Sequence, residues 1–112
     1  MPSALPSSQL FHASAVALDG RGCVIFGPSG AGKSTLALRL MAHGAVLVAD
    51  DQTRISARDG GLYASAPEAL FGQIEARGIG VLQAQALAEA RLALAVDLGQ
   101  PEPERLPPAR QW

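Results

Sequence analysis

The sequence is poor in cysteine, lysine, aromatic residues and net charge, and each shortage narrows what the chain can be. Its 112 residues contain one cysteine, Cys23, which excludes an internal disulfide and favours a reducing compartment. No apolar run approaches the roughly 18 residues of a membrane-spanning helix, and no basic segment precedes a signal-type core. The net charge of −1 is not that of a basic nucleic-acid-binding protein. We therefore expect a soluble, cytoplasmic protein that binds neither membrane nor nucleic acid.

Alanine supplies many of the apolar residues, which together make up 48% of the chain. The length suits one domain, which we expect to span residues 1–112, with a loose lead-in over 1–8 and a proline-rich tail over 100–112. Because each alanine buries little area, the predicted core is thin. Association into a homo-oligomer would help to bury it.

The most specific pattern is a glycine-rich stretch from Gly27 to Ser34. It has the sequence GPSGAGKS and matches the phosphate-binding pattern G-x-x-x-x-G-K-[ST] at every position. The apolar run Cys23–Phe26 before it is typical of a buried strand, and the residues from Thr35 onward are typical of a helix. This order predicts a nucleotide-binding loop, made of Gly27, Pro28, Ser29, Gly30, Ala31, Gly32, Lys33, Ser34 and Thr35.

The residue types of this loop indicate its chemistry. Glycines allow backbone N–H groups to turn towards a polyphosphate, and the positive end of the helix dipole adds to the attraction. Lys33 is the only lysine, beside eight arginines, and its compact ammonium suits the β- and γ-phosphates of a nucleotide. The Ser34 hydroxyl is expected to bind Mg²⁺.

Apolar periodicity and turn residues predict the other elements. The expected strands are Leu10–Leu18, Cys23–Phe26, Ala45–Ala49, Arg54–Ala57, Leu62–Ser65 and Leu92–Leu98. The expected helices are Lys33–His43, Ala66–Gln73 and Gln83–Ala90, and Ile74–Gly80 is expected to be irregular or at a strand edge. An Asp-Gly turn joins the first two strands into an antiparallel hairpin. The predicted fold class is therefore α/β, a P-loop nucleotide-binding fold with a mixed sheet.

Two adjacent carboxylates, Asp50 and Asp51, follow the strand that comes after the loop and its helix. Ligands of open α/β sheets lie at the carboxyl ends of strands, so these residues are expected near the nucleotide. Neighbouring residues on a strand point to opposite faces, so one aspartate should face the nucleotide and the other should face away or bind backbone. The first could hold Mg²⁺, directly or through water, or accept a proton from an attacking hydroxyl.

Three further residues are candidates on weaker grounds. Glu75 and Arg77 share one face if their segment is extended. A Glu there could complete the Mg²⁺ shell and an Arg could offset charge on a phosphoryl group, although an ordinary surface pair has the same pattern. His12 lies in an apolar run before the loop, where a histidine is more often structural than catalytic.

Together these pieces resemble the catalytic domain of HPr kinase/phosphorylase, especially its short single-domain versions. The resemblance covers about residues 10–106. It is carried by the strand with His12, the loop GPSGAGKS, and the segments LVADD, APEAL and IEARGIG, of which the last is close to the signature of that family. It implies an HPr-kinase/PEP-carboxykinase-like fold and an enzyme that uses ATP and Mg²⁺ to phosphorylate a serine of the phosphocarrier protein HPr.

The resemblance also implies residue roles. Asp51 is expected to be the base for the serine hydroxyl, and the acid in the reverse reaction with phosphate. Glu75 is expected to be a second Mg²⁺ contact beside Ser34. Asp50 is also expected on the metal side, from its place after the strand rather than from the resemblance. His12, Arg77 and Arg105 are expected in the active site with Lys33.

The sequence departs from the family pattern after Gly80. The stretch between Gly80 and Arg91 is short and lacks a Gly-Ala-Gly loop, and the sequence ends at Trp112. We therefore expect phosphorolysis of phosphorylated HPr to be weak or absent. Two other functions stay open: a nucleotide-sensing module with little turnover, and a kinase for a small-molecule hydroxyl. No N-K-x-D motif for guanine is present, which argues against a GTPase.

Overall fold

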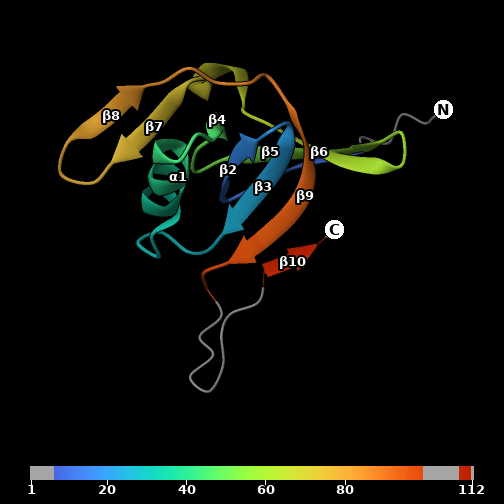
Figure 1. Cartoon of the computed structure of the whole chain (residues 1–112), viewed down its shortest axis with the longest axis horizontal. Helices are drawn as coiled ribbons and strands as arrows, with labels where there is room; N and C mark the ends of the chain where they lie inside the picture. Colours follow the sequence, from blue (N-terminus) through green and yellow to red (C-terminus); the bar gives the residue numbers. More distant parts are fainter. Residues whose placement is uncertain (1–6, 100–108, 112) are drawn as a thin grey trace.

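The computed structural model describes residues 7–99 and 109–111 and consists of one α-helix packed on a curled mixed sheet (Figure 1). In chain order its elements are β1 (Ser8–Phe11), β2 (Ala13–Leu18), β3 (Arg21–Phe26), α1 (Lys33–Ala42), β4 (Val46–Ala49), β5 (Thr53–Arg58), β6 (Gly61–Ser65), the 3-10 turn η2 (Glu68–Leu70), β7 (Gln73–Ala76), β8 (Gly80–Gln83), β9 (Ala90–Asp97) and β10 (Ala109–Gln111).

The main sheet has the strand order β1-β5-β6-β9-β3-β2-β4, with β10 paired to β9. Strands β3 and β9 are parallel, whereas β2 is antiparallel to both β3 and β4. The predicted antiparallel hairpin before the loop is therefore confirmed, and so is the mixed α/β class. Strands β7 and β8 form a separate two-stranded sheet that lies beside α1 (Figure 1).

The alternation of side chains along β2 divides the core into two layers. Ala13, Ala15 and Ala17 face an alanine-rich cluster on one side of the sheet. Val16 faces the other side, where it packs with Ile25, Leu47, Ile74 and the helix residue Ala37. Helix α1 and strand β7 cover this second side, through Ala37 and Ile74.

Helix α1 begins and ends at residues whose backbone suits a helix terminus. Gly32, its N-cap, has a positive φ of 99°. At the other end, Gly44 has a φ of 107°, its N–H bonds the Met41 carbonyl, and the Ala45 N–H bonds the Leu40 carbonyl. This is a Schellman motif, in which glycine takes the left-handed conformation at little energetic cost. The predicted helix is confirmed to within one residue.

The predicted strand Leu10–Leu18 is broken in the structure. The chain bends at His12, so β1 pairs with β5 while β2 pairs with β3 and β4. The apolar run looks continuous in sequence, but β1 is the edge strand at one end of the sheet, and β2 lies beside β4 at the other end. The bend also separates His12 from the hydrogen-bonding register of both strands, so its side chain is free to face the loop region.

Three other segments differ from prediction. Residues 83–90 are not helical: between the end of β8 and the start of β9 they are irregular, apart from a bridge between Ala86 and Leu47 and a hydrogen bond from the Leu87 N–H to the Leu47 carbonyl at 2.9 Å. Alanines alone provide no apolar stripe strong enough to hold a helix against the sheet. The helix predicted over Ala66–Gln73 is only the 3-10 turn η2, and the segment Ile74–Gly80 contains most of β7 and the turn to β8.

The predicted proline-rich tail lies mostly outside the described residues, but residues 109–111 form strand β10 on β9. Within the described residues, no helix is both long enough and apolar enough to cross a membrane. The expected cytoplasmic location and homo-oligomeric state stay predictions.

Candidate functional site: a phosphate-loop cleft with an aspartate pair

The glycine-rich loop connects β3 to α1 and surrounds the first turn of the helix. Gly30 and Gly32 both have positive φ values, 86° and 99°, and a Cβ atom added at either would meet open space. Glycine is favoured at these positions because their backbone is left-handed, not because a neighbour crowds them. The first turn of α1 contains no acidic residue and no side-chain cap, so its N–H groups face the cleft as a positive helix end.

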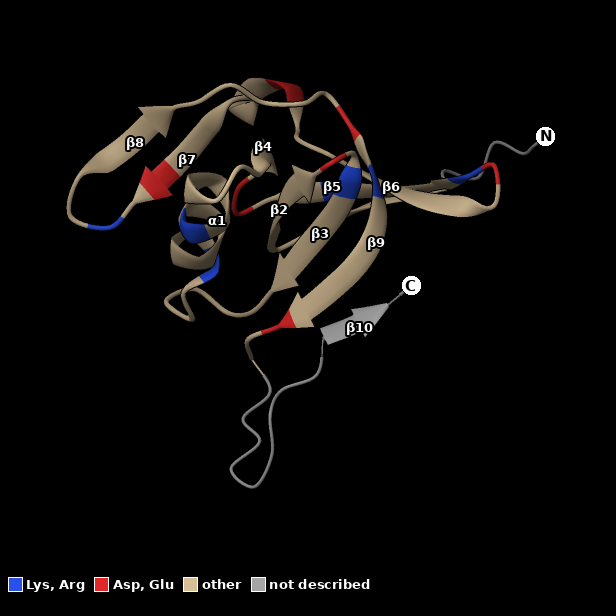
Figure 2. Ribbon diagram, in the orientation of Figure 1, with Lys and Arg blue, Asp and Glu red and all other residues tan. Residues whose placement is uncertain are grey.

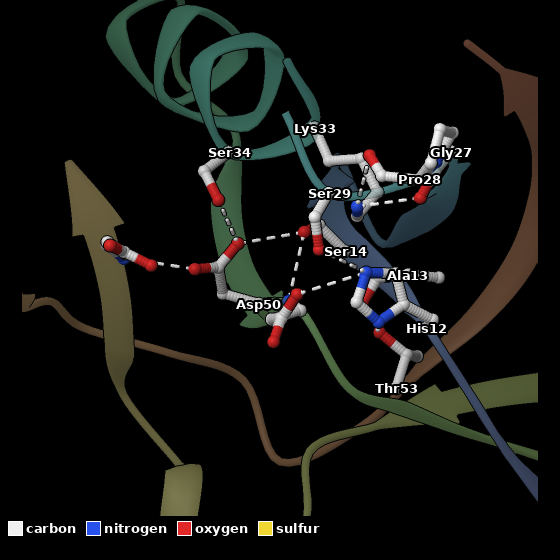
Figure 3. Close-up of polar contacts among 12 residues, drawn as sticks. His12, Ala13, Ser14, Gly27, Pro28, Ser29, Lys33, Ser34, Asp50 and Thr53 are labelled. Atoms are coloured by element: carbon white, nitrogen blue, oxygen red, sulfur yellow. Dashed lines mark hydrogen bonds and ion pairs between the residues drawn. The ribbon is translucent and has the colours of Figure 1, made fainter. Parts of the chain in front are cut away.

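The Lys33 side chain folds back into this loop (Figure 3). Its ammonium donates hydrogen bonds to the carbonyls of Gly27 at 2.7 Å and Pro28 at 3.1 Å, and the residue is only 5% exposed. The loop thus keeps its one ammonium at the helix terminus through neutral acceptors. Anionic oxygens form stronger hydrogen bonds with an ammonium than neutral carbonyls do.

A cleft of about 290 Å³ opens in front of the loop. Its lining brings together residues that are far apart in the sequence: Ser29, Gly30, Gly32, Lys33, Ser34 and Thr35 from the loop and helix, Asp51 from the segment after β4, and Glu75, Arg77 and Gly78 from β7 and its turn. The structure therefore gathers the predicted loop, acid and hairpin residues around one space.

Asp50 is buried behind this cleft and joins three elements (Figure 3). Its Oδ1 accepts hydrogen bonds from the hydroxyls of Ser34 at 2.6 Å and Ser14 at 2.8 Å, and its Oδ2 accepts one from the Glu75 N–H at 2.9 Å. Asp50 is 7% exposed and is not among the residues that line the cleft. It thus holds two cleft residues in place: the Ser34 hydroxyl and the backbone of Glu75.

Asp51 has the opposite orientation. Its side chain is 58% exposed and lines the cleft. The expectation that one aspartate faces the cleft and the other binds elsewhere agrees with this geometry, but the cause differs. Strand β4 ends at Ala49, and Asp51 has a left-handed backbone with a φ of 69°, so a turn rather than strand alternation separates the two side chains.

His12 lies at the rim beside Asp51. Its Nε2 is 3.5 Å from Asp51 Oδ1 and 3.3 Å from the Ser29 hydroxyl. The bend between β1 and β2 places it there, which a continuous strand would not have done. His12 therefore connects the exposed aspartate with the glycine-rich loop.

Glu75 and Arg77 both line the cleft, although only Glu75 lies on a strand. Arg77 begins the turn between β7 and β8, where Figure 2 shows a basic residue beyond the acidic one on β7. Both residues lie at the same cleft, as predicted. The turn after β7, rather than an extended backbone, places Arg77 there. Arg105 is outside the described residues, and its assignment to the site stays a prediction.

Sequence reasoning missed Ser14. Its hydroxyl donates to Asp50 and accepts a hydrogen bond from the Asp51 N–H at 3.1 Å, and the residue is completely buried. The only indication of Ser14 in the sequence is a polar residue within the apolar run of β2, on the same face of the strand as Val16. That signal is weak because a serine among alanines also occurs without a function.

The donors in the cleft suit a hard cation. The Ser34 hydroxyl and the Glu75 carboxylate are oxygen donors at the helix end, and Mg²⁺ prefers oxygen ligands. Among the described residues, no cluster of three or more His, Cys, Asp or Glu side chains forms a metal site by itself. Mg²⁺ is commonly bound by one or two carboxylates together with phosphates of a substrate, which matches this donor set.

Fold and site define a mixed α/β domain with a glycine-rich loop between β3 and α1 at the edge of a cleft. A family model described as HPr Serine kinase C-terminal domain matches residues 3–100. The chain is 43% identical over 82 residues to HPr kinase/phosphorylase of Clostridium perfringens, covering 73% of this chain and 26% of that protein. It is 37% identical over 113 residues to that of Geobacillus kaustophilus, covering 94% of this chain and 36% of that protein.

A solved structure agrees with these sequence matches. The Hpr(Ser) kinase/phosphatase of Coxiella burnetii superposes with a TM-score of 0.76 and 28% identity, covering 88% of this chain and 69% of that one. The chain belongs to the family of HPr serine kinase C-terminal domains. It spans about a quarter to a third of the length of these two curated relatives, at 26% and 36%.

Proposed function

We propose that this domain is an ATP- and Mg²⁺-dependent protein serine kinase whose acceptor is an HPr-like phosphocarrier protein. One observation carries the proposal: a single cleft is lined by Lys33, Asp51 and Glu75. Phosphoryl transfer requires a cradle for the donor phosphates, a cation site and a group that orients the acceptor hydroxyl. The names of the relatives supply the acceptor, because those proteins are described as kinases of HPr.

In this proposal the loop residues bind the donor. Lys33 leaves the carbonyls of Gly27 and Pro28 and binds the β- and γ-phosphates, exchanging neutral acceptors for anionic ones. The N–H groups of the first turn of α1 bind the remaining phosphate oxygens. Arg77, at the opposite wall of the cleft, offsets negative charge on the group that is transferred.

Asp51 is the proposed catalytic base. It accepts the proton of the serine hydroxyl as the serine oxygen forms a bond to the γ-phosphorus and the bond to the β-phosphate oxygen breaks, which leaves ADP. Its exposure suits contact with an incoming side chain. His12, 3.5 Å away, positions the Asp51 carboxylate at the rim. Arg105 is proposed to join this site.

Ser34 and Glu75 are the proposed Mg²⁺ contacts. When bound, Mg²⁺ neutralises charge on the phosphates. Asp50 supports both contacts, because it accepts the Ser34 hydroxyl hydrogen and the Glu75 N–H on separate carboxylate oxygens. We therefore assign Asp50 to the metal side of the site through these two residues.

The surface next to the cleft favours a protein acceptor over a small molecule. Val81 is opposite Glu75 in the β7–β8 register, so the two side chains share one face of the hairpin. Val81 is 63% exposed and Ile79, in the turn, is 75% exposed. These apolar side chains continue the wall formed by Glu75 and Arg77 outward. A protein acceptor would cover them, whereas a small hydroxyl compound would leave them in water.

The test is transfer of label from γ-labelled ATP with Mg²⁺ to three acceptors: HPr, HPr with its acceptor serine changed to alanine, and small hydroxyl compounds such as free serine. The proposal predicts label on intact HPr alone. Label on the small compounds would make the domain a small-molecule kinase. Binding of ATP without transfer to any acceptor would identify a nucleotide sensor instead.

A further inference from the structure

The backbone of Asp51 is in an unusual conformation for a residue with a side chain. Its φ of 69° is in the left-handed region, which aspartate enters more readily than most residues but which still requires support from its surroundings. This conformation is what turns the Asp51 side chain into the cleft while Asp50, its neighbour, stays buried.

Strand β2 supplies the support on both sides of Asp51. The Asp51 N–H donates to the Ser14 hydroxyl oxygen at 3.1 Å, and the Asp51 carbonyl accepts from the Ala13 N–H at 3.1 Å. The second bond uses backbone and would exist with any residue at position 13 except proline. The hydrogen bond from the Asp51 N–H depends on the Ser14 hydroxyl, so it requires a particular side chain at position 14.

The same hydroxyl has a second partner. Ser14 Oγ donates to Asp50 Oδ1 at 2.8 Å, and that oxygen also accepts from Ser34. The buried Ser14 hydroxyl thus bonds both aspartates. It donates its hydrogen to the Asp50 carboxylate and accepts a hydrogen bond from the Asp51 backbone N–H. Ser14 is 0% exposed, so water cannot take over either bond without entering the core.

We propose that Ser14 is a positioning residue for phosphoryl transfer. Its hydroxyl fixes the left-handed conformation of Asp51, and it connects the position of this base with the Ser34 side of the cleft through Asp50. This inference rests on the proposed kinase function for its catalytic consequence, but the structural link between Ser14 and Asp51 is separate from it.

The test compares Ser14→Ala with the matched control Thr53→Val. Thr53, on β5, is equally buried and donates its hydroxyl to the Ala13 carbonyl at 2.7 Å, so each change removes one buried hydroxyl bonded to the site or to its neighbour in β2. In Ser14→Ala, kcat is expected to fall about 10- to 100-fold, since small displacements of a reacting group have effects of that size. The affinity for ATP should stay within about twofold, because Asp50 keeps its bonds to Ser34 and Glu75. Thr53→Val should retain kcat.

Two readouts separate positioning from a general loss of stability. The Asp51 amide should exchange with solvent faster in Ser14→Ala than in the wild type. In Thr53→Val, the Asp51 amide should exchange at the wild-type rate. Ser14→Thr, which keeps the hydroxyl, should recover kcat; if Ser14→Ala does not fold, Ser14→Cys takes its place with an intermediate kcat expected. An unchanged kcat together with unchanged Asp51 exchange would overturn the inference.

Failure of the proposed function would look different. If the wild type transfers no phosphoryl group to any acceptor, the kinase proposal fails and Asp51 amide exchange alone decides the role of Ser14. Faster exchange in Ser14→Ala would then support the structural link, and equal exchange would overturn it.

Discussion

Asp50 offers the sharpest test of how the site is built. It accepts three hydrogen bonds in a nearly water-free position, from Ser14, Ser34 and the Glu75 N–H. An asparagine has the same shape but only one accepting oxygen. If that oxygen faces the serines, its NH₂ group opposes the Glu75 N–H. If it faces Glu75, the NH₂ group faces Ser14 and Ser34, and their hydroxyl hydrogens lose the oxygen that accepted them.

Either orientation of the amide leaves a buried donor without a partner. Such a donor destabilises a protein by about 1–3 kcal/mol. For a domain of this size, about 2 kcal/mol lowers the melting temperature by roughly 8–16 °C. The Ser34 hydroxyl also loses its acceptor or is held in another rotamer. We therefore expect Asp50→Asn to weaken binding of ATP with Mg²⁺ about tenfold or more, which corresponds to about 1.4 kcal/mol.

The assay combines thermal unfolding, followed by circular dichroism, with calorimetric titration of ATP and Mg²⁺. Asp59→Asn is the matched control, because Asp59 is in the β5–β6 turn with its side chain 80% exposed. That control should change stability by less than about 0.5 kcal/mol and leave binding intact. If Asp50→Asn has the melting temperature of the wild type and binds ATP and Mg²⁺ with the same affinity, the three hydrogen bonds to Asp50 do not hold the site together.

Three further predictions follow from named contacts. Lys33→Ala should abolish ATP binding in calorimetry, since the loop then has no ammonium for the phosphates. Ile79→Ser, at a position 75% exposed beside the cleft, should raise KM for HPr several-fold without changing the affinity for ATP; an unchanged KM would exclude this surface from docking. Gly22→Ala should destabilise the fold by about 1–3 kcal/mol in urea unfolding, because its Cβ would be 2.9 Å from the Arg91 carbonyl oxygen. Gly61→Ala, whose Cβ would meet the movable Arg91 side chain instead, should be milder, and equal losses would contradict this steric account.

The strongest sequence predictions concern segments whose information is local. The loop Gly27–Ser34, helix α1 and the Asp-Gly turn before β3 depend on residues within one or two turns of each other, and the structure has each of them as expected. The opposite orientations of Asp50 and Asp51 were expected from strand alternation, but β4 ends at Ala49 and the left-handed backbone of Asp51 produces them instead.

The remaining features depend on contacts that are distant in the sequence. The break at His12 comes from the change of partner between β1 and β2, which an apolar run does not encode. Residues 83–90 follow β4 instead of forming a helix, through the bridge of Ala86 and the hydrogen bond of Leu87 to Leu47. Ser14 gains its significance only from Asp50 and Asp51, which are 36 and 37 residues away. A single sequence identifies neither partner.

We propose that Asp51 takes the acceptor proton in a transfer from ATP to a protein serine. The most direct measurement is transfer of label to HPr by the wild type and by Asp51→Asn, with ATP binding measured in both. We predict that Asp51→Asn binds ATP as the wild type does and lowers the transfer rate by a factor on the order of 10² or more. Equal transfer by the two proteins would contradict the account.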